Sequence, residues 1–347
     1  MKIIAVTLFV LSPFLLLAQT GGVNVFPFLD LGYNARAVAL GREFITAYDD
    51  DINMGVLNPA SLNEEMHHSI GFNHALHAGG INHGQLAYGR HFDGIGTGAA
   101  HLRYVAYGEM DRMDVNGEKI GTFSAGDFIL GASLGKKLNP RISIGASLNL
   151  IWSQLESYSS FGLSLDLAGM YESENERTTV TAIVKNAGFQ LSTYTKTEEN
   201  NRAPLPIQPM LGISHRLQHA PFRFSVVAHN LNQWDLTYND PTLEPTVDPL
   251  TGEEIPVPEA GFGEKLGRHF IFQLEVLGGD VLRIRGAFDY NQRRQFLVEN
   301  RPGMGGFSFG VGLNFKRFSV DYGLKVFSSA GFNNLLTLRT DFDKWKK

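Results

Sequence analysis

Apolar and polar residues alternate along most of the chain from about residue 68 onward. In the clearest segment, Phe307, Phe309 and Val311 alternate with Ser308 and Gly310. A period of two is typical of β-strands with one apolar and one polar face. The alternation predicts about fourteen strands, at 69–76, 83–91, 97–107, 127–137, 141–155, 161–172, 177–191, 207–217, 222–236, 269–277, 281–291, 307–316, 318–326 and 334–342.

The lengths of the strands and of their connections indicate a membrane barrel. Many segments approach the roughly 9 to 11 residues that a tilted strand needs to cross a bilayer. Long connections such as 108–126, 192–206 and 236–268 alternate with short ones such as 138–141 and 316–317. Bacterial outer-membrane barrels have an even number of strands, short periplasmic turns and longer outer loops. We therefore predict an all-β fold, a transmembrane antiparallel β-barrel in the outer membrane, with both termini in the periplasm.

The polar face of the C-terminal strands carries charged residues. If the apolar face meets lipid, these residues face the lumen, where opposite charges can pair across strands. We interpret this inward set as a charge network that fills the lumen rather than as a transport path. It comprises Arg283, Arg285, Asp289, Asp321, Lys325, Arg339 and Asp341.

The N-terminus has the layout of a secretory signal. Lys2 precedes an apolar run from Ile3 to Ala18, and polar Gln19 follows. Such a run is typical of a cleaved signal peptide and is too short for a comfortable membrane-spanning helix. We therefore expect three parts: a signal peptide at 1–18, an N-terminal hatch at 19–67 and the barrel at 68–347.

Composition argues against several classes of function. The chain has no cysteine, which removes both a disulfide framework and a lipidated cysteine anchor. Its formal net charge is -5 and no cluster of Lys and Arg stands out, so a nucleic-acid partner is not expected. No nucleophile elbow or other signature groups the serines and histidines, so we expect neither catalysis nor a cofactor.

Histidine is the one chemically suggestive residue type. His67, His68, His74, His77 and His83 crowd the first predicted hairpin. His74 and His77 could approach one another near the rim and bind a metal ion. Their spacing matches no standard zinc pattern, so we expect ordinary rim histidines and no metal site.

The segment at 19–67 does not alternate and is expected to plug the lumen. A short helix is predicted at 33–47, with Asp30 or Asn34 as its N-cap. An acidic run at 49–51 and the breaker pair at 58–59 predict an irregular, compact segment around it.

An ordered series of hatch residues carries a family resemblance. The series consists of Ala35, Arg36, Leu40, Gly41, Asp49, Asp50, Asp51, Asn58, Pro59 and Ala60. It resembles the start of the PorV/PorQ-like outer-membrane proteins, and the PorQ branch matches best in signal, hatch and barrel length. That family is similar to the FadL-type long-chain fatty acid transporters, which share an Asn-Pro-Ala hatch element and a fourteen-strand barrel. Arg42 departs from the family pattern, which usually has a second glycine there.

The resemblance implies a non-enzymatic role in the attachment complex of the type IX protein secretion system of Bacteroidetes. A barrel of this kind would anchor a PorZ-like surface protein beside PorU and PorV-like components, in contact with outer-membrane lipid and lipopolysaccharide. The similarity to FadL-type barrels implies an alternative, a channel for hydrophobic small molecules. A transporter would need a continuous apolar pocket between hatch and wall, whereas an anchor needs none.

Two predicted outer loops are candidates for docking a partner. The longest, at 236–268, is rich in proline and acid and cannot bury much apolar area, so it is either a solvated loop or a docking surface. A second candidate surface is 109–125. Calcium bound by the acidic residues is disfavoured because their spacing is not that of a known calcium loop. The candidate partner-binding residues are Asp240, Glu244, Asp248, Glu253, Glu254, Glu259, Asp111 and Asp114.

Overall fold

The computed structural model describes most of the chain after the predicted signal peptide. The predicted signal peptide at 1–18 lies outside the described residues, and the hatch is described from Asn24 onward. Within the described chain, no helix is both long enough and apolar enough to cross a membrane. The described residues are 24–76, 80–195, 202–237, 246–247, 254–255, 260–279, 281–296, 303–328 and 331–345.

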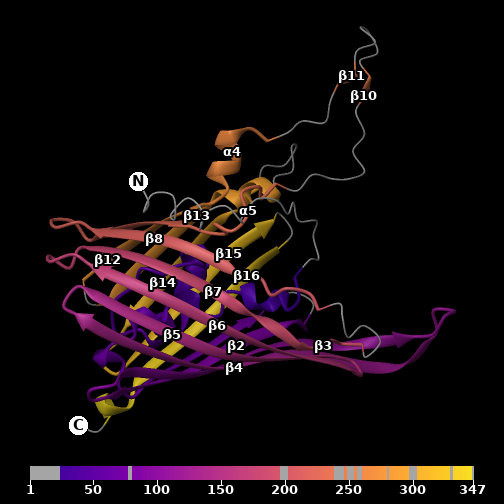
Figure 1. Ribbon diagram of the computed structural model, residues 1–347, viewed down its shortest axis with the longest axis horizontal. Coiled ribbons are helices and arrows are strands. Elements are labelled where there is room, and N and C mark those ends of the chain that lie inside the picture. The colour runs from indigo at the N-terminus through magenta and orange to yellow at the C-terminus, as the bar shows by residue number, and fades with distance from the viewer. Residues whose placement is uncertain are drawn as a thin grey trace, which may run out of the picture.

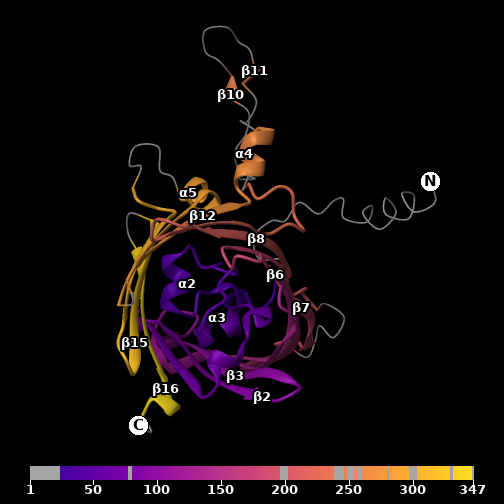
Figure 2. The ribbon, with the colours of Figure 1, turned by 90° about the vertical axis from the view of Figure 1, so that its left-hand side faces the viewer.

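Fourteen antiparallel strands close into a barrel, as the sequence predicts (Figures 1 and 2). Each strand pairs with the next along the barrel, and β1 pairs with β16 to close it. Closure leaves the barrel wall without an edge strand, so its backbone polar groups pair between strands. The barrel strands are β1 (Ser69–Leu76), β2 (Asn82–Phe92), β3 (Gly96–Met113), β4 (Lys119–Asn139), β5 (Ile142–Leu155), β6 (Tyr158–Glu172), β7 (Thr178–Ser192), β8 (Gln208–Arg216), β9 (Phe222–Ala228), β12 (Phe270–Gly278), β13 (Leu282–Asp289), β14 (Phe307–Asn314), β15 (Phe318–Ser328) and β16 (Gly331–Asp341).

The outer face of the wall is apolar. On β14, Phe309, Val311 and Leu313 are exposed, whereas Ser308 before them and Gly310 between them are buried toward the lumen. Exposed leucine, isoleucine and phenylalanine side chains recur on the other strands. An apolar outward band of this kind matches the hydrocarbon layer of a bilayer.

The two ends of the barrel differ in their connections. One end, called here the short-turn end, carries the connections 93–95, 140–141, 173–177, 217–221, 279–281 and 315–317. The other, called the long-connection end, carries the long connections 193–207, 229–269 and 290–306 together with the short connections 77–81, 114–118, 156–157 and 329–330. The connection 229–269 includes the short helix α4 (Phe262–Gly267) and the two-stranded sheet of β10 (Thr246–Val247) and β11 (Glu254–Ile255), and the connection 290–306 includes the short helix α5 (Tyr290–Gln295).

Two predicted strand boundaries are wrong. The strand expected at 222–236 ends at Ala228, because the chain turns away through a left-handed conformation at Asn230 (φ 52°). The predicted loop at 108–126 is instead a two-stranded ribbon in which Met110 pairs with Phe123. This ribbon continues β3 and β4 beyond the barrel wall and projects at the right of Figure 1.

The hatch lies inside the barrel, where its indigo segments fill the lumen in Figure 2. The helix predicted at 33–47 is much shorter, because Gly41 and Arg42 adopt positive φ (79° and 90°) and end it. Asn34 is its N-cap and accepts a hydrogen bond from the Ala37 amide at 2.7 Å. The hatch elements are η1 (Pro27–Asp30), α2 (Ala35–Ala39), α3 (Ile52–Leu57), η2 (Pro59–Ser61) and η3 (Glu64–Met66).

The described chain begins and ends at opposite ends of the barrel. Near the start, the Val25 amide donates to the Pro204 carbonyl, in the β7–β8 connection of the long-connection end, at 3.0 Å. Near the end, Asp343 of η6 (Phe342–Trp345) lies 2.8 Å from His68, at the short-turn end. The hatch thus runs through the lumen from the long-connection end to the short-turn end before β1 begins.

Candidate functional site

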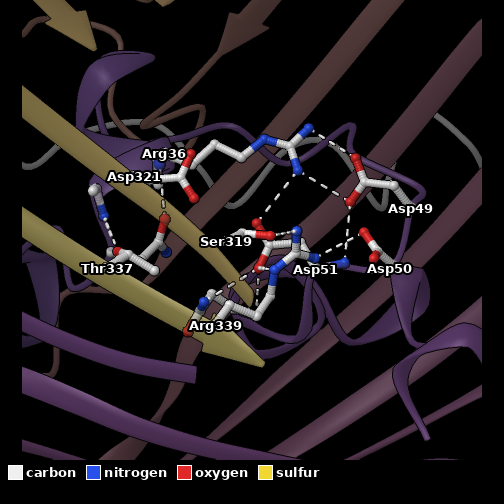
Figure 3. A network of polar contacts seen from close by, with 12 residues as sticks. Arg36, Asp49, Asp50, Asp51, Ser319, Asp321, Thr337 and Arg339 are labelled. Carbon is white, nitrogen blue, oxygen red and sulfur yellow. Dashed lines mark hydrogen bonds and ion pairs between the residues drawn. The ribbon is translucent and has the colours of Figure 1, made fainter. Parts of the chain in front are cut away.

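A buried ion network fixes the hatch to the barrel wall (Figure 3). Arg36 of α2 makes a bidentate pair with Asp49, at 3.0 and 2.8 Å, within the hatch. The same guanidinium donates from Nε to Glu275 of β12 at 3.2 Å. The side chain thus joins two parts of the hatch to a strand of the wall.

Glu275 is the centre of this network on the wall side. Its carboxylate also accepts from Arg223 at 2.9 Å and from Arg285 at 3.0 Å, and Arg285 pairs with Asp321. Three guanidinium groups therefore share one fully buried carboxylate. Charged hydrogen bonds between buried partners are among the stronger polar contacts in proteins.

The other hatch carboxylates have wall or hatch partners too. Asp50 accepts from Arg339 of β16 at 2.8 Å. Burial favours the neutral form of Asp49, but the adjoining Arg36 outweighs burial and holds the pKa of Asp49 below its usual range. Burial likewise opposes ionisation of Glu43, whereas Lys185 and Arg42 outweigh it and lower the pKa of Glu43 to about 2. Both carboxylates are therefore charged at neutral pH.

The Asn-Pro-Ala element packs the hatch directly on the wall. Asn58 donates from Nδ2 to the Ile45 carbonyl at 2.8 Å and accepts from the Ala60 amide at 3.0 Å, which shapes the turn. A Cβ on Gly145 of β5 would lie 2.3 Å from the Pro59 carbonyl oxygen, and one on Gly135 would lie equally close to it. Two glycines in the wall thus allow the hatch backbone to contact the strands.

At the long-connection end the lumen carries an apolar surface. Ile129 of β4 and Ile151 of β5 are directly paired, point inward and are almost completely buried, as is Val105 of β3. Phe26 and Phe28 of the hatch belong to the same buried cluster. Inward positions of a water-filled barrel are usually polar, so this surface is a departure from the pattern.

At the short-turn end the lumen opens into a polar cavity of about 600 Å³. Its lining includes Lys137, Glu172, Arg177 and Arg223 of the wall and Asp49 of the hatch. A cavity lined by both signs of charge suits water and ions rather than apolar molecules.

The comparisons with known proteins concern the fold. The chain matches no protein-family model and no curated protein. The toluene transporter TbuX of Ralstonia pickettii aligns with 92% of this chain and 100% of its own, at 13% identity and a TM-score of 0.54. The toluene transporter TodX of Pseudomonas putida aligns with 90% and 99%, at 13% identity and a TM-score of 0.55. The monoaromatic hydrocarbon channel CymD aligns with 90% and 98%, at 13% identity and a TM-score of 0.51.

These three proteins share the barrel fold of this chain. At 13% identity the likeness concerns the fold alone. The comparisons give no support to the expected role in type IX secretion. That expectation rests on the sequence resemblance of the hatch alone.

The structure places the family-like hatch residues at contacts between hatch and wall or within the hatch. The Ala35 amide donates to Thr337 of β16 at 2.9 Å, and the carbonyls of Leu40 and Gly41 accept from Gln273 and Lys325. Arg42 stands where the family usually has glycine, in a left-handed conformation, and donates to the Asp30 carbonyl at 2.7 Å. The ion network described above contains Arg36, Asp49, Asp50 and Asp51. The turn described above contains Asn58, Pro59 and Ala60.

Most of the predicted partner-binding residues lie outside the part of the chain that the structure describes. Glu254 lies on β11, where only its backbone is described. Asp111 pairs with Lys119 across the β3–β4 ribbon at 2.5 Å, and Asp114 accepts from the amides of Asn116 and Glu118 and so shapes its tip. Outside the described residues lie Asp240, Glu244, Asp248, Glu253 and Glu259.

The histidines are arranged differently from the expectation. His74 lies 2.8 Å from the Tyr104 hydroxyl, and His77 lies outside the described residues. The structure instead brings His67 and His68 together with Asp343. Sequence reasoning missed this group because Asp343 follows His68 by 275 positions.

The predicted set of inward residues also lacked Glu275 and Arg223. The alternation of apolar and polar residues in their strands nevertheless indicates that both side chains point into the lumen. On β12, the inward residues Gln273, Glu275 and Leu277 alternate with outward residues. Arg223 of β9 is paired with Glu275 and therefore also points inward. The pattern could therefore have identified both as inward residues. It could not have shown that they meet each other and Arg36 at one point.

Proposed function

We propose that this protein is an outer-membrane channel of the FadL type that admits hydrophobic small molecules of the size of toluene. The observation that carries the proposal is the apolar luminal surface of Val105, Ile129 and Ile151, covered by Phe26 and Phe28 of the hatch. The full-length likeness to barrels described as toluene transporters supports it. An apolar molecule would occupy this surface when the first hatch segment withdraws, since binding sites for such ligands are concave and mainly apolar.

Passage would require the hatch to move. Below the apolar surface, the network of Arg36 and Glu275 places buried charges across the lumen. An apolar ligand cannot replace the hydrogen bonds of those charges, so it would not pass along the barrel axis while the network is intact. The polar cavity beyond it would serve as an aqueous vestibule rather than as the ligand site.

Uptake of labelled toluene tests this proposal. The double variant Ile129→Ser/Ile151→Ser is expected to lower uptake into proteoliposomes at least about tenfold, because each buried isoleucine contributes about 1.5–3 kcal/mol. Ile183→Ser is the control, because Ile183 is an equally buried inward residue in a different luminal cluster. Equal uptake by the double variant, the control and the original protein would contradict the proposal.

A second candidate is the anchoring role in type IX secretion, with a PorZ-like surface protein as partner beside PorU and PorV-like components. The observation that favours it is the β3–β4 ribbon, which extends past the wall at the long-connection end. Outside the barrel its strands pair only with each other within the described chain, and Val115 at its tip is fully exposed. Projecting loops of rigid scaffolds commonly carry binding residues.

Affinity purification distinguishes this second role from transport. We expect a tagged copy from detergent-solubilised outer membranes to retain a surface protein in near-equal amount, and a copy with 107–125 replaced by a short turn to lose it. A tagged unrelated barrel controls for non-specific recovery. Unchanged retention after the replacement would contradict docking on the ribbon, whereas toluene uptake should not depend on it.

A further inference from the structure

The short-turn end has a cluster of metal-ligating side chains outside the site described above. It lies where the hatch joins β1 and the last strand ends, and consists of His67, His68 and Asp343. Each offers one ligand atom, and these atoms lie within 4.8 Å of one another. The rings of the two histidines are 3.8 Å apart, and Nδ1 of His68 lies 2.8 Å from a carboxylate oxygen of Asp343.

The backbone brings the two histidines to the same side. Successive side chains of an extended chain point in opposite directions. His68 instead has φ 57°, a left-handed conformation that is uncommon outside glycine. Its amide donates to the Gly89 carbonyl at 2.9 Å, and its carbonyl accepts from the Phe342 amide at 3.2 Å. Neighbouring strand ends thus hold His68 in this conformation from both sides.

We propose that His67, His68 and Asp343 bind a divalent transition-metal ion, with Zn²⁺ as the reference ion. Imidazole nitrogens and a carboxylate oxygen are ordinary zinc ligands, and three of them leave a fourth position for water. His68 and Asp343 are partly exposed, with 27% and 43% of their side-chain surfaces accessible, so an ion can reach them from solvent.

Two features of the metal-free geometry weaken binding. Zinc–ligand bonds of about 2.0–2.2 Å require ligand atoms roughly 3.5 Å apart, so the side chains must close slightly around the ion. Nδ1 of His67 accepts a hydrogen bond from the His91 amide at 3.0 Å. A neutral imidazole has one free lone pair, so coordination through either ring nitrogen releases this hydrogen bond. Binding therefore loses one hydrogen bond that the metal-free protein has.

A bound ion would link the start of β1 to η6 after β16. Strands β1 and β16 pair with each other and close the barrel, with Ser69 opposite Asp341. An ion that binds only the folded barrel raises its stability by mass action. Zn²⁺ is therefore expected to raise the thermal unfolding temperature of the barrel.

Calorimetric titration of the tag-free, EDTA-treated barrel in detergent with ZnCl2 tests the site. One ion is expected to bind per chain, and His67→Gln, His68→Asn and Asp343→Asn should each weaken binding at least about tenfold. Asparagine tolerates the left-handed conformation at position 68. His219→Gln is the control, because His219 lies on the 217–221 turn at the same end of the barrel.

Folding of each variant is checked by its heat-modifiable migration on gels. The expected result is that Zn²⁺ raises the unfolding temperature of the original protein and of His219→Gln but not of the three ligand variants. Absence of saturable binding at millimolar ZnCl2 would overturn the proposal. So would equal Zn²⁺ affinity in the original protein and all three folded ligand variants, since the ion would then bind elsewhere.

Discussion

Glu275→Gln is expected to lower the free energy of unfolding by about 3–5 kcal/mol and to raise ion conductance through the lumen. The Glu275 carboxylate pairs with three guanidinium groups, those of the buried Arg36 and Arg285 and of the partly exposed Arg223. Removing one partner of a buried ion pair leaves uncompensated charge, which destabilises by about this amount. Arg36 is the only one of the three on the hatch, so its release from the wall loosens the plug.

Urea unfolding in detergent micelles measures the first effect, and single-channel recording in planar bilayers measures the second. Glu174→Gln is the control, because Glu174 pairs with Arg141 on an exposed turn. Exposed pairs contribute about 0–1 kcal/mol, so the control should unfold and conduct like the original protein. If Glu275→Gln has the same free energy of unfolding and the same conductance as the control, the ion network does not hold the hatch in place.

The barrel was predictable because its strands obey a local rule. Each strand shows the period of two in its own sequence, so the number of strands and the inward set, including Arg285, Asp321 and Lys325, could be predicted without long-range information. Strand ends were less certain, since pairing rather than pattern decides them. The β3–β4 ribbon shows this, because cross-strand pairs such as Met110 with Phe123 extend the strands through a polar segment.

The candidate sites were harder to predict because they join distant parts of the chain. Arg36 and Glu275 are 239 positions apart, and no local pattern connects them. The direction of the hatch was equally hidden, since its irregular sequence does not indicate at which end of the barrel it begins. The apolar luminal surface of Ile129 and Ile151 was not predicted, for another reason. The alternation assigns them to the inward face of their strands, but a polar lumen is the ordinary expectation for that face.

A methyl group added to Gly145 is expected to separate the hatch from the wall. The Cβ of an alanine there would lie 2.2 Å from the carbonyl carbon of Pro59 and 2.5 Å from the amide nitrogen of Ala60. Both atoms belong to the hatch backbone, which cannot give way as a flexible side chain can. We therefore expect Gly145→Ala to destabilise the protein by about 3 kcal/mol, the upper part of the range for overpacking.

Gly169→Ala is the matched control for this substitution. Gly169 lies on the neighbouring strand, paired with Ile144, and a Cβ there meets no atom within 4 Å. The control should change stability by less than about 0.5 kcal/mol. Limited proteolysis should cleave the hatch near Pro59 in Gly145→Ala but not in Gly169→Ala. Equal protection in both variants would mean that the wall tolerates the added methyl group, and that contact with Pro59 does not hold the hatch in place. The ion network around Glu275 would then be the main attachment of the hatch to the wall.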